Sequence, residues 1–137
     1  MSLDSIRQSV ATAVGSALTG FTDYSVVVEY DNRIVVDTQM QIVPFLTVET
    51  KLLDGFQADL SDKPIHRLLG QIHLAVAAPE GAGRAQANKL LDHLYPKLQR
   101  KKLGVIHTRM AVPAPERQHL GWVYYPVLIP FWSDQLT

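Results

Sequence analysis

Five histidines are the residues of this sequence best suited to proton transfer or metal binding: His66, His73, His93, His107 and His119. No pair of them has the spacing of a zinc-binding motif such as HExxH, so the sequence predicts no metal site. His73 and His107 fall on the polar faces of two expected strands and would approach each other only if those strands are neighbours. We expect two histidines that face solvent.

Nucleophilic catalysis and phosphate binding have no complete motif either. The GxSxG nucleophile elbow is absent. Residues 79–89, PEGAGRAQANK, place glycines before an expected helix but lack the Gly-Lys-Ser/Thr ending of a phosphate-binding loop and the GxGxxG fingerprint. Gly81 and Gly83 therefore indicate a strand-to-helix turn. Several acids near an expected loop form no defined catalytic pair: Glu49, Asp54, Asp59 and Asp62. The sequence predicts a protein that is not an enzyme and holds no cofactor.

Charges balance over the whole chain. Its 137 residues include 13 Lys plus Arg and 13 Asp plus Glu, which gives a formal net charge of +0. This balance argues against a protein that attracts nucleic acid by its overall charge. The basic run Arg100-Lys101-Lys102 is interpreted as the end of a helix, where cations are favourable, although it could contact nucleic acid locally. The chain has no cysteine, which excludes disulfides and thiolate chemistry.

Two helices are expected within a single domain that spans residues 1–137. Apolar residues recur at helical spacing over residues 3–18, and Gly20 is a natural stop for this helix. The second helix is expected over residues 83–101, where leucines form an apolar stripe. Pro96 is expected to kink this helix or to end it a turn early.

Alternating apolar and polar residues predict strands over 44–52, 65–78, 104–112 and 121–132, and a β-rich run covers 25–30. Residues 54–64 and 113–120 are expected loops, and residues 31–43 are either an extended arm or a strand. The expected order is therefore α-β-(β)-β-β-α-β-β. This order predicts an α+β fold in which two helices pack on one face of a mainly antiparallel sheet of four to five strands.

The last expected strand has two unusual features. Pro126 and Pro130 both lack a backbone N–H on the same side of the strand, so we expect this strand at or near a sheet edge. Its outward face carries large apolar residues, which a one-sided sheet does not normally expose. We therefore expect a helix or a second subunit to cover that face. Three aromatic residues are the candidates for a subunit interface: Trp122, Tyr124 and Trp132.

Two stretches of the second half resemble the tail terminator proteins of long-tailed bacteriophages, also called tail-completion or tail-to-head joining proteins. These stretches are RLLGQIHLAVAAPEGAGRAQANKLLDHLYPKL at 67–98 and GWVYYPVLIPFWSD at 121–134. In that family a strand with an early glycine leads into a Pro-x-Gly-x-Gly turn, a helix rich in Ala and Leu, and two strands. The helix near Leu3, VEYDN at 28–32 and PFLTVE at 44–49 fit as well. The positions that match the pattern are Gly70, Pro79, Gly81, Gly83, Phe131 and Asp134.

The resemblance implies a structural virion protein that forms a ring, usually a hexamer, at the head–tail junction of the phage. Such a ring binds the tail tube protein at the end of the tube, stops its polymerisation and offers a surface to the head–tail connector protein. DNA is a partner only by passage through the ring, and the family has neither enzyme activity nor a cofactor. Assembly in the host cytoplasm agrees with the absence of a signal peptide and of an apolar stretch of ~20 residues.

The ring contacts have to be predicted from this sequence, because the family's motif residues build the fold. The long segments 31–43 and 54–64 are expected to reach the tube or a neighbouring subunit. The polar candidates for these contacts are Arg33, Asp37, Gln39 and Gln41. The alternative function is a small α+β ligand-binding domain or enzyme, with a pocket on the sheet face. That alternative requires converging polar groups and a residue with a shifted pKa.

Overall fold

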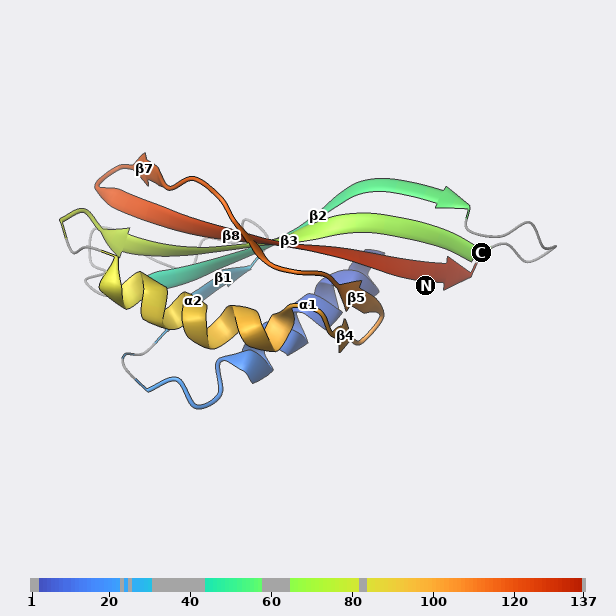
Figure 1. Ribbon diagram of the computed structural model, residues 1–137, viewed down its shortest axis with the longest axis horizontal. Coiled ribbons are helices and arrows are strands. Elements are labelled where there is room, and N and C mark those ends of the chain that lie inside the picture. The colour runs from blue at the N-terminus through green and yellow to red at the C-terminus, as the bar shows by residue number, and fades with distance from the viewer. Residues whose placement is uncertain are drawn as a thin grey trace.

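Two helices pack against one face of a long, curved sheet in the computed structural model (Figure 1). The structure describes residues 3–22, 24, 26–30, 44–57, 65–81 and 84–136. Helix α1 spans Leu3–Ala17, and helix α2 spans Ala85–Leu98. The predicted α+β class and the two helices on one face are therefore confirmed.

The sheet has eight strands among the described residues, so the predicted count of four to five is wrong. The strands follow the order β1-β2-β3-β8-β5-β4, and β6 and β7 also pair with β8. Strands β1 and β2 are parallel and the other pairs are antiparallel, as a mainly antiparallel sheet requires. Their bounds are β1 Val28–Tyr30, β2 Phe45–Gln57, β3 Ile65–Pro79, β4 Lys102–Leu103, β5 Ile106–Thr108, β6 Val112–Pro113, β7 Arg117–His119 and β8 Trp122–Leu136.

The two prolines of β8 explain why one of its sides is paired only in short pieces. β8 pairs with β3 along its whole length. On the other side, the carbonyl oxygens of Pro130 and Pro126 accept hydrogen bonds from the backbone N–H groups of Arg109 (2.8 Å) and Ala114 (3.1 Å). A residue's N–H and C=O point to the same side of an antiparallel strand, so both missing donors lie on this side, as predicted. A continuous ladder cannot form there.

Two predicted elements near the end of the chain are wrong for this reason. The single strand over 104–112 and the loop over 113–120 are replaced by β5, β6 and β7, which pair with β8 between its prolines and beyond them. β8 is therefore not an edge strand, but it lies near the sheet edge as predicted, because only short strands pair with its proline side. The hairpin turn between β7 and β8 is only Leu120-Gly121, and both residues have positive φ angles, 49° and 82°.

The hairpin β2–β3 is also longer than predicted. β2 continues to Gln57, past a β-bulge at Leu53 where the register shifts between Leu52 and Asp54. The first part of the predicted loop 54–64 is thus strand, because a bulge takes up an extra residue without ending the pairing. Residues 58–64, and the segment 31–43 that was either arm or strand, lie outside the described residues.

The helices end close to their predicted limits. α1 stops at Ala17, and Gly20 has a positive φ of 90° as expected for a stop. α2 contains Pro96 in its last turn and stops at Leu98, three residues before the predicted end at 101. The run Arg100-Lys101-Lys102 consequently lies beyond the helix, so its interpretation as a helix end is wrong.

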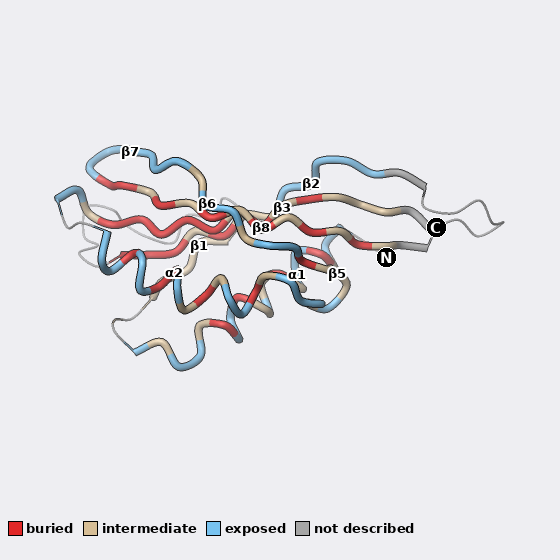
Figure 2. Tube along the Cα trace, viewed as in Figure 1, coloured by how far each residue is buried: buried red, intermediate tan, exposed pale blue. Residues whose placement is uncertain are grey.

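The core lies between the helices and the inner face of the sheet, which is the face turned toward them. Figure 2 shows the buried stretches along the facing sides of these layers. Helix α1 contributes Ile6, Val10 and Val14, and α2 contributes leucines that include Leu90 and Leu94. Each such side chain stabilises the fold by about 1.5–3 kcal/mol when it is removed from water. Both predicted apolar stripes are therefore the buried sides of their helices.

Candidate functional site

The outer face of the sheet, turned away from both helices, is the candidate functional surface. Residues of β3 and β8 point alternately to the two faces, so alternation leaves the outer face to His73 and its neighbours on β3 and to Trp122, Tyr124, Leu128 and Trp132 on β8. Trp122 and Trp132 lie ten residues apart along one strand, or roughly 33 Å. The outer face thus has two separate aromatic regions.

The first aromatic region is packed within the chain itself. The rings of Phe45 and Trp122 meet edge to face with centroids 5.0 Å apart, and Tyr124 lies 6.4 Å from Phe45. Ala77 completes this cluster, in which Trp122 is only 5% exposed. The prediction that a helix or a second subunit must cover Trp122 is wrong, because β2 and β3 supply its cover.

The second region is the Trp132 stack, formed by Arg67, His107, Trp132 and Asp134. From β5 on one side of β8, the His107 ring stacks on Trp132 with centroids 4.0 Å apart and planes 7° apart. From β3 on the other side, the Arg67 guanidinium lies 4.3 Å from the Trp132 ring centroid. Arg67 also binds both carboxylate oxygens of Asp134, at 2.7 and 2.9 Å. Both flanks of the Trp132 ring are therefore occupied.

Arg67 and Asp134 form an ion pair at this end of the sheet, and each shifts the pKa of the other. The hydrogen bonds from Arg67 lower the pKa of the Asp134 carboxyl, and the same pair raises the pKa of Arg67. The bidentate geometry fixes the guanidinium plane over the tryptophan. The two side chains are 34% and 31% exposed, and the pair holds the Arg67 guanidinium in place over Trp132.

Between the two aromatic regions lies the outer-face groove, a hollow of about 630 Å³. It is lined on the described surface by polar side chains that include Glu49, Lys51, His73, Arg117 and Tyr124. His73 lies 3.0 Å from the Gln71 side-chain oxygen, and Lys51 lies 4.0 Å from Glu49. The alternative function predicted a groove of this kind.

Burial is the main cause of the pKa shifts in this groove. Desolvation lowers the pKa of His73, and the positive charges of Lys51 and Arg117 lower it further, while Glu49 opposes them. Desolvation likewise raises the pKa of Tyr124, with a smaller contribution from Glu29. These groups remain partly open to solvent, and the described lining residues include neither serine nor cysteine. The groove lining combines a histidine and a tyrosine with cations and acids, which suits a polar ligand.

Comparisons with known proteins identify the fold and nothing more specific. A solved structure known only by a sequence identifier superposes with a TM-score of 0.66, at 16% sequence identity, over 100% of this chain and 98% of that chain. No protein-family model matches the sequence, and no curated protein matches it. At this identity the likeness shows a shared fold over the whole chain.

The predicted contact residues are not brought together in one place. Tyr124 and Trp132 are partly exposed at different ends of β8, and Trp122 is buried, so the three do not form one patch. The predicted tube or subunit contacts Arg33, Asp37, Gln39 and Gln41 lie outside the described residues. Their roles stay predictions.

His73 and His107 are not neighbours, although both lie on the outer face. They flank β8 from opposite sides and oppose Leu128 and Trp132, four residues apart along that strand. Within the described part of the chain, no group of three His, Cys, Asp or Glu residues could hold a metal ion. No described helix is long and apolar enough to cross a membrane.

Sequence reasoning named Trp132 but missed Arg67 and His107 as its partners. The opposite charges of Arg67 and Asp134 were a usable signal, since each lies near the end of an expected strand. Which residues face each other depends on the register of β3, β8 and β5, and the sequence pattern left that register open.

The lowered pKa of His73 predicts a pH dependence of stability. Because the folded state resists protonation of His73 more than the unfolded chain does, stability falls as pH decreases below about 6.5, the ordinary histidine value. The His73→Gln variant should lose less stability than the natural protein between pH 7 and pH 5. Urea denaturation at several pH values measures this, with His119→Gln on exposed β7 as the control. Equal acid sensitivity in all three proteins would contradict the prediction.

Proposed function

We propose that this protein is a structural ring subunit of the bacteriophage tail terminator type. The ring would sit at the head–tail junction of the virion, bind the end of the tail tube and present a surface to the head–tail connector. The sequence resemblance supports this proposal over nearly the whole chain, and the α+β fold with helices on one face of the sheet agrees with it. A homohexamer is the expected ring.

The observation that carries the proposal is the placement of exposed apolar side chains at the two opposite lateral edges of the sheet. Leu52 and Leu53 of β2 are 40% and 60% exposed, and within the described residues β1 pairs with β2 only as far as Val48. On the far side of β8, Met110 and Val112 are 63% and 52% exposed. A cyclic ring joins two different surfaces of each subunit, head to tail. Two apolar sites on opposite sides of the sheet meet this requirement.

A pair of single variants tests the ring. Leu53→Glu and Met110→Glu should each abolish the ring, because each would place a charge in a desolvated contact. Both residues are exposed in the single chain, so the melting temperature should change little. Light scattering over a range of concentrations, with negative-stain images, measures the assembly in the presence of tail tube protein.

The matched control is Leu3→Glu, which changes a 58% exposed leucine at the start of α1. This variant should assemble like the natural protein, since an acid suits a helix N-terminus. A natural protein that stays monomeric both alone and with tube protein would contradict the proposed function. Rings that persist in both the Leu53→Glu and the Met110→Glu variant would place the subunit contact elsewhere.

The outer-face groove favours one second candidate, a small ligand-binding domain. Its specific support is the half-buried His73, with Lys51 and Arg117 beside it, which together suit a small anion. Binding of such a ligand should shift the His73 ring resonances in NMR titrations. We rank this candidate second because one of the groove's acids, Glu49, already pairs with Lys51.

A further inference from the structure

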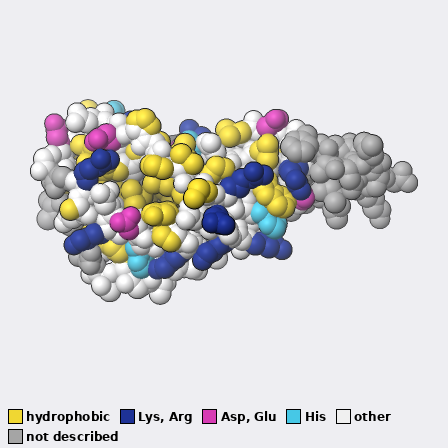
Figure 3. Space-filling view, viewed as in Figure 1, with side chains coloured by type: hydrophobic (Ala, Val, Ile, Leu, Met, Phe, Trp, Pro, Cys, Tyr) yellow, Lys and Arg dark blue, Asp and Glu magenta, His cyan; other side chains and the backbone are white. Residues whose placement is uncertain are grey.

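A cluster of cations without a described acidic partner lies at the end of α2, away from the outer-face groove. No Asp or Glu occurs between Asp92 and Glu116 in the sequence, whereas this interval holds Lys97, Arg100, Lys101, Lys102 and Arg109. Figure 3 shows Lys and Arg side chains gathered over this part of the molecule. The chain is neutral overall, so this concentration is local.

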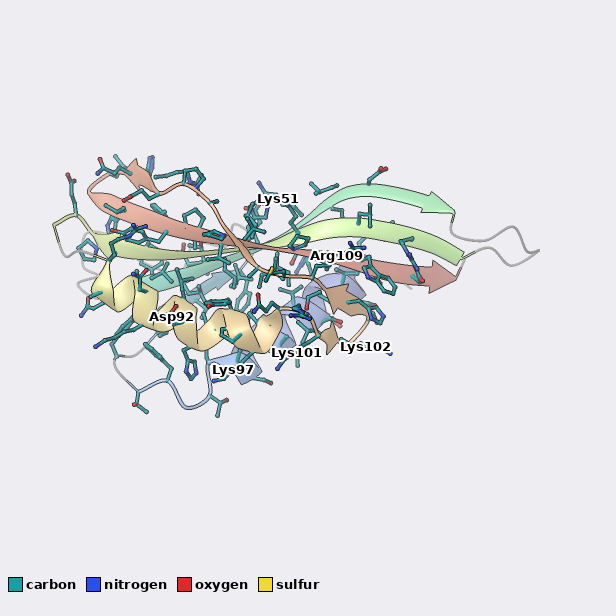
Figure 4. All side chains as sticks on the ribbon, in the orientation of Figure 1. Lys51, Asp92, Lys97, Lys101, Lys102 and Arg109 are labelled. Atoms are coloured by element: carbon teal, nitrogen blue, oxygen red, sulfur yellow. The ribbon has the colours of Figure 1, made fainter. Side chains whose placement is uncertain are left out.

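The basic hairpin, residues 100–109, brings these charges together. Strands β4 and β5 pair Lys102 with His107, and the backbone N–H of Arg100 donates to the Arg109 carbonyl at 3.1 Å. Arg100, Lys101, Lys102 and Arg109 line one hollow of about 530 Å³. Figure 4 shows Lys97 on the adjacent end of α2, whereas Asp92 lies farther back along that helix. Five cations thus lie around the C-terminal end of α2.

Nothing on the described surface neutralises the hairpin. The ion pairs among described residues join Arg7 to Asp4, Lys51 to Glu49 and Arg67 to Asp134, and none includes a hairpin cation. The hairpin cations therefore have no acidic partner among the described residues and suit an external polyanion.

Two features of the basic hairpin are expected to lower the stability of the fold. Arg100 has a φ of 55°, a left-handed backbone conformation that residues other than glycine rarely adopt. The backbones of Arg100 and Arg109 are also hydrogen-bonded to each other, which brings two like charges into one hollow. Positive charge is therefore retained where glycine or a neutral residue would be more stable, which points to a function for it.

The hairpin is rigidly placed despite these features. The buried Thr108 hydroxyl lies 2.5 Å from the Leu98 carbonyl of α2 and accepts a hydrogen bond from the Lys101 N–H at 2.9 Å. At the turn between β4 and β5, the Ser133 hydroxyl of β8 donates to the Val105 carbonyl at 2.6 Å. The cations therefore project from a fixed backbone.

We propose that the basic hairpin, together with Lys97, binds the phosphate backbone of duplex DNA without reading its sequence. Lys and Arg are the usual contacts to phosphates, whereas Lys is depleted in protein–protein interfaces. Single strands are bound by stacking bases on aromatic rings, and the nearby Trp132 is already flanked by His107 and Arg67. Charges more than about 10 Å away are screened at ordinary salt, so chain neutrality does not oppose this local contact. The proposal does not depend on ring formation.

The test measures binding of a fluorescent 30-base-pair duplex of mixed sequence by anisotropy, at about 50 mM and about 200 mM salt. Five phosphate contacts predict a loss of roughly 500-fold in affinity between these salt concentrations. The triple variant Lys101→Gln/Lys102→Gln/Arg109→Gln should bind at least roughly 30-fold more weakly at low salt, with a shallower salt dependence. Its melting temperature shows whether the fold is intact.

The matched control removes three exposed cations elsewhere, as Arg7→Gln/Lys89→Gln/Arg117→Gln, and should keep the affinity within about threefold. Equal losses in the two triple variants would overturn the proposal, as would absence of binding by the natural protein at low salt. Tighter binding of the corresponding single strand would also overturn it. Polyglutamate that competes as well as DNA, at equal charge, would instead assign the hairpin to an acidic protein surface.

Discussion

Replacing Gly70 with alanine is expected to destabilise the fold by about 3 kcal/mol. Gly70 lies in the middle strand β3, where its partners are Leu52 of β2 and Phe131 of β8. A Cβ atom at this position would lie 2.5 Å from the Lys51 carbonyl oxygen and 2.5 Å from the Phe131 ring. The backbone oxygen belongs to a paired strand next to the β-bulge, so it cannot move without breaking the ladder.

The midpoint of urea denaturation measures this loss, with an unchanged slope if the two-state transition is retained. The matched control is Gly15→Ala on the exposed side of α1, where a Cβ atom meets nothing within 4 Å. That variant should be more stable by roughly 0.5–1 kcal/mol. Adding Phe131→Leu to Gly70→Ala should recover part of the loss, because it leaves only the contact with the carbonyl. A Gly70→Ala protein as stable as the natural one would show that β2 yields at the bulge.

Replacing Thr108 with valine is the second large effect that we expect, a loss of roughly 3 kcal/mol. Valine has the same shape, so the change removes the hydroxyl and little else. The hydroxyl is buried and serves both the Leu98 carbonyl at the end of α2 and the Lys101 N–H. The Leu98 carbonyl would lose a buried hydrogen bond and the Lys101 N–H a partly buried one, and each unsatisfied group costs about 1–3 kcal/mol when buried.

Thermal and urea denaturation measure the loss, and faster hydrogen exchange at the Lys101 amide would locate it. Thr108→Ser is the matched control, because it keeps the hydroxyl and should lose only about 1 kcal/mol for the missing methyl group. Equal stability of the valine and serine variants would show that the hydrogen bonds contribute little. The same valine variant should weaken DNA binding if the basic hairpin depends on this anchor.

The two substitutions act at the positions that hold the candidate surfaces in place. Gly70 allows β2 and Phe131 to approach β3 closely, and the Trp132 stack lies on the other face of the same strands. Thr108 joins the end of α2 to the basic hairpin. Function on either surface should therefore be more sensitive to these buried residues than their distance from the surface suggests.

Periodicity in the sequence determined the α+β class, both helices and the two long strands of the β2–β3 hairpin. These elements follow from local spacing, since an apolar stripe repeats every three to four residues in a helix and every two in a strand. The placement of both proline donors on one side of β8 was also readable, because it depends only on alternation along that strand. The inward faces of the strands were predictable for the same reason.

Tertiary structure alone decided which residues meet. The stack of His107, Trp132 and Arg67 combines three strands, and it exists only because β5 and β3 flank β8 in one particular register. The basic hairpin likewise depends on the end of α2 at Leu98, which frees the three following residues to fold back toward Arg109. Local sequence patterns do not fix these pairings, because contacts between distant segments depend on the packing of the whole chain.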